Sequence, residues 1–121
     1  MIVAVAPIVP PDGTYAWQFY LINDDDEPIE SGAVDTMSYE WGDNATSERV
    51  GTSFGAIPPG TALAIHRELD TEMRTSITGR VTIGGVEQPF GAEFGRLYAP
   101  GSCTLVPIPI LGALGMLPLR E

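Results

Sequence analysis

Apolar and polar side chains alternate along much of this chain, and this period of two constrains the fold more than any other feature. The alternation is longest over residues 73–83, where Ile77, Val81 and Ile83 share one face and polar side chains occupy the other. The segment Thr14–Asn23 repeats it with large side chains on one face, namely Tyr15, Trp17, Phe19 and Leu21. No long segment follows the helical period. Because successive side chains on a strand point to opposite faces, the pattern predicts half-buried β-strands.

Turn signals separate these strand candidates. The clearest is Gly84-Gly85, which predicts a two-residue type I′ hairpin with Val86 opposite Ile83, since both turn positions need a positive φ. Pro89 cannot donate a hydrogen bond to a neighbouring strand, so its strand is expected at a sheet edge or bulged there. Other turns are predicted at Asp24–Pro28, Gly42–Asn44 and Pro58–Gly60.

The weaker segments give more detailed expectations. Over Ile29–Trp41 we expect an extended segment with a bulge or bend at Gly32 and with Met37 facing inward together with Tyr39 and Trp41. Over Thr61–Arg67 the side chains of Leu63 and Ile65 are expected inward, which leaves His66 outward. A last strand is predicted over Cys103–Val106.

Six to eight short strands with turns between them predict an all-β fold, an antiparallel β-sandwich with extended apolar terminal segments. An immunoglobulin-like topology is the first choice, and a jelly-roll-like sandwich or small barrel is the second. The 121 residues suffice for one domain, predicted over residues 1–106, followed by a proline-rich apolar arm over residues 107–121. Cys103 is the single cysteine, so the fold contains no internal disulfide.

The charge is distributed unevenly along the chain. The net charge of −10 comes from 16 carboxylates and 6 arginines, yet residues 1–48 hold ten of the carboxylates and no cation. A chain without a basic patch is not expected to bind nucleic acid, because such binding displaces counterions from phosphates. The uncharged segment Leu97–Leu119 contains seven prolines and glycines, so no membrane span is expected. The N-terminal segment lacks the charged start of a signal peptide, which favours a cytoplasmic or virion-associated location.

Few residues offer catalytic chemistry. His66 is the only histidine, and an outward strand position predicts a polar surface residue rather than a catalytic or metal-binding one. Cys103 has no cationic neighbour in the sequence that would lower its pKa, so a small buried hydrophobic role is expected. The sequence therefore predicts no catalytic residue, no metal site and no cofactor. A small enzyme built on paired carboxylates stays an alternative.

The acidic run of Asp24, Asp25, Asp26 and Glu27 is predicted to be a solvated turn. Adjacent carboxylates point in alternate directions, which disfavours their convergence on one Ca²⁺ ion. Two functional alternatives remain open for this run. One is a Ca²⁺-dependent ligand-binding sandwich, and the other is an acidic binding or inhibitory module for a cationic protein.

The terminal segments are the most informative feature for function, because residues 1–11 and 97–119 are strongly apolar. Exposed on a monomer, the C-terminal segment would form an outsized apolar patch. It is expected either to fold back along the edge of its own domain, paired with Ile2–Val9, or to reach onto a neighbouring subunit. Pro107 and Pro109 would hold it extended. The predicted partner-binding residues are Ile108, Ile110, Leu111, Leu114, Met116, Leu117, Ile2, Val3 and Val5.

These observations favour a non-enzymatic structural or interaction subunit of a larger, repeating assembly. The expected partners are other protein subunits, in a homo- or hetero-oligomer. A virion decoration or accessory protein is one concrete version of this hypothesis. It rests on small size, acidity, apolar ends and the scarcity of catalytic residues rather than on a motif.

Overall fold

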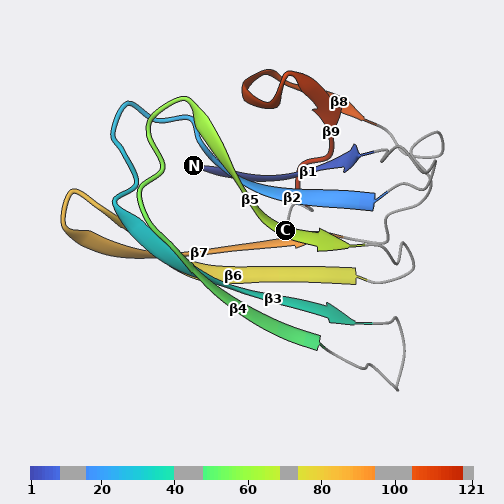
Figure 1. Ribbon diagram of the computed structural model, residues 1–121, viewed down its shortest axis with the longest axis horizontal. Coiled ribbons are helices and arrows are strands. Elements are labelled where there is room, and N and C mark those ends of the chain that lie inside the picture. The colour runs from blue at the N-terminus through green and yellow to red at the C-terminus, as the bar shows by residue number, and fades with distance from the viewer. Residues whose placement is uncertain (9–15, 40–47, 69–73, 95–104, 119–121) are drawn as a thin grey trace.

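Two antiparallel sheets packed face to face form the body of the protein (Figure 1). The computed structural model describes residues 1–8, 16–39, 48–68, 74–94 and 105–118. One sheet has the order β1-β2-β5, made of β1 (Ile2–Ile8), β2 (Ala16–Asn23) and β5 (Thr61–Glu68). The other has the order β4-β3-β6-β7, made of β3 (Ser31–Tyr39), β4 (Glu48–Phe54), β6 (Arg74–Ile83) and β7 (Val86–Phe94). The predicted all-β sandwich is confirmed.

The connectivity of the seven strands is immunoglobulin-like. In an immunoglobulin constant domain the first, second, fifth and fourth strands form one sheet, and the third, sixth and seventh form the other. Here the fourth strand, β4, pairs with β3 instead of β5 and so belongs to the second sheet. This change leaves β5 at the edge of the first sheet and β4 at the edge of the second.

The core lies between the sheets and follows the alternation of β2 and β6. Trp17, Phe19 and Leu21 are fully buried on β2, as are Ile77 and Val81 on β6. From β7, Phe94 packs edge-on against Phe19 with ring centroids 5.0 Å apart. The Thr14–Asn23 segment thus forms the central strand of its sheet, with β2 lying between β1 and β5.

The hairpin between β6 and β7 also follows its sequence signal. Gly84 and Gly85 have φ angles of 58° and 77°, and Ile83 pairs with Val86. Pro89 lies on β7, the edge strand, and the register of β6 with β7 has no bulge. The strand that contains Pro89 was predicted to be either at a sheet edge or bulged, and the structure shows that it is at an edge.

The predicted bulge at Gly32 is wrong, because β3 pairs with both β4 and β6 in unbroken register. Gly32 instead makes room for an aromatic ring. A Cβ atom at this position would lie 2.5 Å from Cζ of its cross-strand partner Phe54. Gly79 on β6 is covered in the same way by Phe90, its partner on β7. Each edge strand thus places one phenylalanine over a glycine of a central strand, which fills the space left by the missing side chain.

The predicted inward position of Met37 is also wrong. Val34 and Thr36 are buried, whereas Met37 is 36% exposed. Residues directly opposite in an antiparallel pair share a face, and Thr36 lies opposite the buried Ile77. The pairing with β6 therefore selects the even positions of β3 as inward. The side chain of Tyr39 and all of Trp41 lie outside the described residues.

His66 does not occupy the predicted outward position. The register of β2 with β5 shifts after Phe19, so that Phe19 pairs with His66 and Tyr20 with Ala64. Ile65 is the extra residue of this β-bulge, and it packs partly buried against the core, as Leu63 does. The bulge turns His66 to the face of Phe19, where the two ring centroids lie 5.5 Å apart. The inward prediction for Leu63 and Ile65 is confirmed.

Candidate functional site

The C-terminal segment forms a small hairpin of its own. Strands β8 (Val106–Ile108) and β9 (Ala113–Gly115) pair antiparallel, joined by the short 3₁₀ helix η2 (Pro109–Leu111). Gly112, with a φ of 63°, closes the turn by donating its N–H to the Pro109 carbonyl at 3.1 Å. The strand predicted over Cys103–Val106 begins only at Val106 in the described residues, and Cys103 lies outside them.

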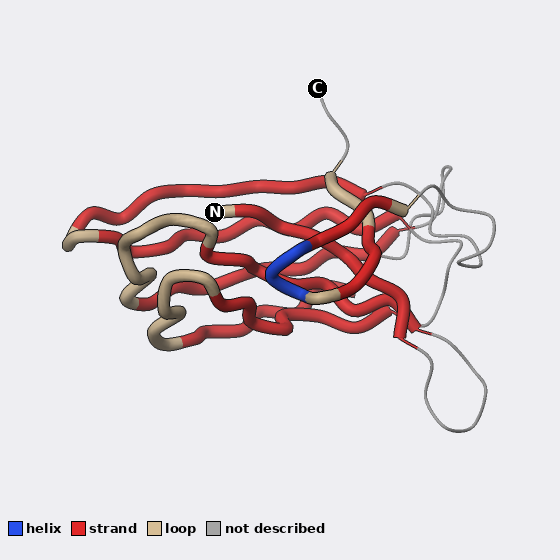
Figure 2. Tube along the Cα trace, turned by 90° about the horizontal axis from the view of Figure 1, so that it is seen from above, coloured by secondary structure: helices blue, strands red, loops and turns tan. Residues whose placement is uncertain are grey.

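This hairpin lies over the outer face of the three-stranded sheet. In Figure 2 it crosses the strands beneath it, with its helix in blue. Ile108 is only 7% exposed and packs against Ala4 and Ile22, while Leu111 packs at the margin of the same cluster. The β1-β2-β5 sheet is therefore covered on both faces, which explains why both faces of β2 carry apolar side chains.

The hairpin is also joined to the free edge of β1. Val5 and Met116 exchange two backbone hydrogen bonds, with N–O distances of 3.0 and 2.7 Å. The approach depends on Gly115, because a Cβ atom there would lie 2.6 Å from the Val5 carbonyl oxygen. Of the two arrangements that the sequence left open, the structure shows the segment folded back on its own domain.

The predicted partner-binding residues divide into two groups in this arrangement. Val3, Val5 and Ile108 are buried inside the chain, and Ile2, Leu111 and Met116 are partly buried. The exposed group comprises Ile110 (36%), Leu114 (52%) and Leu117 (46%). Val106, 38% exposed, joins them although the sequence analysis did not single it out. We call the four exposed side chains the hairpin surface: Val106, Ile110, Leu114 and Leu117.

A shallow groove of about 340 Å³ lies beside Leu114 on the hairpin. It is lined by Pro107, Ile108, Pro109, Gly112, Ala113 and Leu114. Neither the groove nor the hairpin surface carries an ionisable side chain, since residues 105–118 contain none. An apolar surface with both raised side chains and a hollow is suited to contact with another protein.

The acidic run contacts the other end of the chain. Asp24, Asp25, Asp26 and Glu27 are all exposed, as predicted for a solvated turn. The Met1 ammonium group lies 2.6 Å from Asp24 Oδ1 and 3.1 Å from Asp25 Oδ2. Burial opposes the charge of this ammonium group, but its hydrogen bonds to Asp24 and Asp25 raise its pKa above 8.0. The same hydrogen bond lowers the pKa of Asp24 below 3.8.

Asn23 organises this turn, a role that sequence reasoning missed. Its side chain is fully buried and donates to the carbonyls of Glu27 at 2.8 Å and Ile57 at 2.9 Å. Its Oδ1 accepts the N–H of Asp25 at 3.1 Å. A buried asparagine at the end of an apolar strand is not predictable from periodicity, and one of its three partners, the Ile57 carbonyl, comes from a distant segment.

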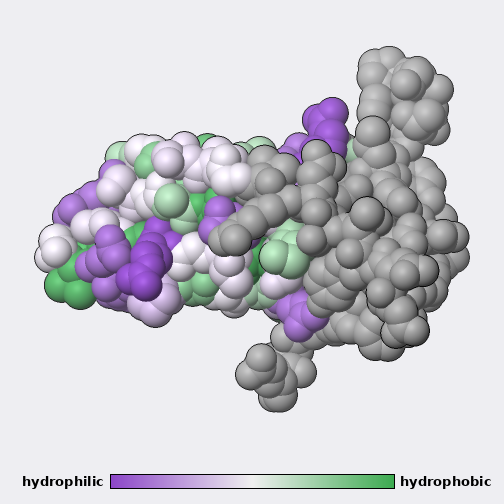
Figure 3. All heavy atoms as spheres, turned by 90° about the horizontal axis from the view of Figure 1, so that it is seen from below, coloured by the Kyte–Doolittle hydropathy of each residue, from purple (hydrophilic) through white to green (hydrophobic). Residues whose placement is uncertain are grey.

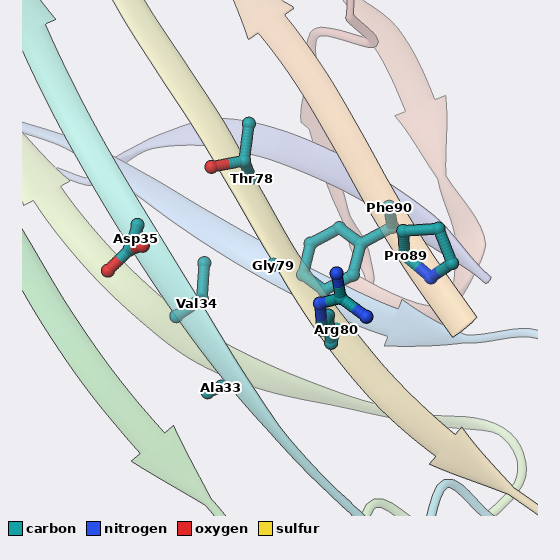
Figure 4. A pocket seen from close by; sticks show the side chains of 8 residues that line it. All are labelled: Ala33, Val34, Asp35, Thr78, Gly79, Arg80, Pro89 and Phe90. Carbon is teal, nitrogen blue, oxygen red and sulfur yellow. The ribbon is translucent and has the colours of Figure 1, made fainter. Parts of the chain in front are cut away.

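The outer face of the four-stranded sheet is different in character. A groove of about 360 Å³ lies over Gly79, and the side chains around it come from β3, β6 and β7 (Figure 4). Arg80 at its rim is paired with Glu87 at 2.9 Å. The coloured part of the surface seen from below is mostly pale or hydrophilic, with green in small separate areas (Figure 3). This side of the described protein lacks the apolar continuity of the hairpin.

The described residues bring together no group of three or more His, Cys, Asp or Glu side chains that could hold a metal ion. They also include no helix long and apolar enough to cross a membrane. Comparisons with protein-family models, curated proteins and solved structures find no match. The hairpin surface is therefore the candidate functional site on the strength of its geometry.

Proposed function

We propose that this protein is a non-enzymatic subunit of a repeating protein assembly, and that it binds neighbouring copies through the hairpin surface. The proposal rests on one observation, which is that one side of the hairpin is buried against the domain while the other side is exposed. Ile108 fixes one side of it to the domain, whereas Leu114 on the hairpin and Leu117 just after β9 are about half exposed.

The physical argument starts from preorganisation. The backbone pairing of Val5 with Met116 and the burial of Ile108 hold the hairpin in place before any partner arrives. A surface ordered in advance loses less conformational entropy on binding than a flexible arm would. Each square ångström of apolar surface removed from water contributes about 25 cal/mol. The exposed leucines can therefore contribute to association with little ordering cost.

The distribution of charge along the chain also favours association through the hairpin surface. Copies of a chain with a net charge of −10 repel one another, and the excess of carboxylates lies in residues 1–48. Residues 105–118, which contain the hairpin, add no charge of their own. Contact between copies is least opposed where both surfaces are uncharged, which supports association through the hairpin rather than through the acidic turn.

The experiment is a double substitution, Leu114→Ser with Leu117→Ser, followed by light scattering across a range of concentrations. We expect a lower average mass than that of the parent protein at every concentration. The matched control is Val86→Ser, since Val86 is 59% exposed and lies on the other sheet. An unchanged mass for the double variant, or an equal loss in the control, would contradict the proposal.

Substitution is a cleaner test than deletion of the whole segment. Removal of residues 107–121 would also take away Ile108 and uncover Ala4 and Ile22, which are buried in the intact chain. A truncated chain would then change its association because its sheet is exposed. Serine at the two exposed leucine positions leaves the buried side of the hairpin intact.

A further inference from the structure

The two sheets have four outer edges, and three of them carry a feature that hinders pairing with another strand. The edge of β1 is occupied in part by Met116, which pairs with Val5. The edge strand β5 contains the bulge at Ile65. The edge strand β7 contains Pro89, which has no N–H to donate. Bulges, prolines and covering segments are the usual means by which proteins protect their sheet edges.

The fourth edge, that of β4, has no bulge and no proline, and none of the described segments covers it. Its seven residues pair with β3 without a register shift, from Gly32 opposite Phe54 to Ser38 opposite Glu48. It contains no proline, and Gly51, Thr52 and Ser53 in it are exposed. Within the described part of the chain, β4 pairs only with β3. Alternate N–H and C=O groups of a strand in this position point outward and can accept another strand.

We propose that β4 pairs antiparallel with β4 of a second copy of this chain, about a two-fold axis at Gly51, to give one continuous sheet of eight strands. Each copy contributes half of the shared sheet, which runs from one β7 through both β4 strands to the other β7. The inference concerns a different surface from the hairpin and does not depend on it.

The register about Gly51 argues for a second copy as the occupant. It sets Val50 opposite Thr52 of the other copy. It sets Gly51 opposite Gly51 and Arg49 opposite Ser53, so no two like charges face each other. A closed two-fold contact also uses the whole of this short edge on both partners.

The local charge is consistent with self-association. Strand β4 contains one acidic residue, Glu48, and one basic residue, Arg49. Its edge is therefore neutral in a protein whose net charge is −10. Two copies can approach along this edge without the repulsion that their acidic surfaces would cause.

Cross-linking tests the register directly. In a Cys103→Ser parent, Gly51→Cys places one thiol at the proposed axis. Opposite residues in such a pair have Cα atoms about 5 Å apart, which a disulfide can span. Gly51 is not among the positive-φ glycines, and among the described residues a Cβ atom there would contact Asp35 Oδ1 alone, at 3.2 Å. The strand can therefore accept the substitution.

Ser53→Cys in the same parent is the matched control, because both positions are exposed and share one face of β4. In the proposed pair its two copies lie about 14 Å apart, too far for a disulfide. Under mild oxidation we expect Gly51→Cys to form covalent dimer about ten-fold faster than Ser53→Cys. Equal rates, or no dimer from Gly51→Cys, would overturn the proposal.

Association without a cross-link provides a second measurement. Thr52→Lys places a charge at the middle of the β4 edge, whereas Thr78→Lys makes the same change on the central strand β6. We expect only Thr52→Lys to lose the β4 dimer, measured by light scattering in the Leu114→Ser, Leu117→Ser background. Because the hairpin surface is already removed there, the result separates the two contacts. Equal masses for the two lysine variants would overturn the β4 proposal and leave the hairpin proposal to its own test.

Discussion

Val5 and Met116, from opposite ends of the sequence, exchange two backbone hydrogen bonds of 3.0 and 2.7 Å. Through this isolated antiparallel bridge, Met116 pairs with the outer edge of β1. The bridge fixes the position of the C-terminal hairpin. The same hairpin covers the outer face of that sheet through Ile108. It is thus part of the fold, and its exposed leucines are presented at a fixed place on the domain.

Gly115→Ala should weaken this attachment. The added methyl group would lie 2.6 Å from the Val5 carbonyl oxygen and 3.2 Å from Ile108 Cγ1, so the hairpin must shift. We expect a loss of about 1–3 kcal/mol in the free energy of unfolding, measured by urea denaturation. Gly55→Ala is the control, because a Cβ atom there would have no atom of the described residues within 4 Å. Equal midpoints for the two variants would contradict this account of the hairpin.

Asn23→Ala should destabilise the acidic turn and its neighbours. The substitution removes the side-chain donor to the Glu27 carbonyl and one of the two donors to the Ile57 carbonyl, which also accepts the N–H of Ile29, at an expected cost of about 1–3 kcal/mol by urea denaturation. Asn23→Asp preserves the shape but cannot donate, so its loss should be at least as large. Gln18→Ala removes a single bond, to the His66 carbonyl, from a half-buried side chain and should cost less. A stable Asn23→Asp variant would show that shape, and not hydrogen bonding, is what matters.

The contact between Met1 and Asp24 predicts a specific pH dependence. The lowered pKa of Asp24 means that its contribution to stability is present above 3.8 and is lost as the pH falls through the lowered value. The raised pKa of the Met1 ammonium group means that its contribution is present below 8.0 and is lost as the pH rises through the raised value.

Asp24→Asn should therefore lower the denaturation midpoint most between these limits, by a small amount because Asp24 is partly exposed. The difference from the parent should shrink at both more acidic and more alkaline pH. Asp26→Asn serves as the control, since the ion pairs of the Met1 ammonium group among the described residues are to Asp24 and Asp25. A difference that stays constant from acid to alkaline pH would rule out the ion pair as its source.

Gly79→Ala should disrupt the four-stranded sheet. An added Cβ atom would overlap the Ala33 carbonyl oxygen and lie 2.8 Å from Cζ of Phe90. We expect a loss of about 2–3 kcal/mol in thermal or urea denaturation. Gly91→Ala on the neighbouring strand is the control, since its closest atoms would be at 3.8 and 3.9 Å. Equal stability of Gly79→Ala and Gly91→Ala would show that the packing of the Phe90 ring over position 79 does not require a glycine there.

The strands that were predicted correctly are those in which one face carries the largest apolar side chains and the other face includes clearly polar ones. In β2 and β6 a one-residue shift would bury arginine, glutamine or threonine in place of Trp17 or Ile77, so only one facing is stable. In β3 both faces contain apolar residues, and Val34 and Met37 compete for the inward position. The pairing of Thr36 with Ile77 decides between them, and that pairing involves a strand far along the chain. His66 was misplaced because the bulge at Ile65 breaks the period of two.

The apolar character of the candidate site was predictable from the sequence, but the division of its side chains into buried and exposed ones was not. An uncharged apolar segment at residues 97–119 requires burial or a partner, and this follows from the sequence. Which side chains fill which role does not follow, because prolines and glycines interrupt any period that would assign faces. Contacts with Ala4 and Ile22 bury Ile108 and leave Leu114 exposed. That β4 has an edge without a bulge, a proline or a covering segment among the described residues likewise becomes apparent only when the sheet edges are compared.

The sequence by itself determined that this chain forms an all-β sandwich, where several of its turns fall, and that its charge and its apolar surface lie in different segments. Those properties depend on neighbouring residues, through side-chain alternation and local turn geometry. The tertiary structure alone decided the inward face of β3, the position of His66, the burial of Asn23 and the division of the hairpin into packed and exposed sides. Each of these depends on which distant strands become neighbours, because burial and hydrogen bonding are settled by contacts that local pattern does not specify.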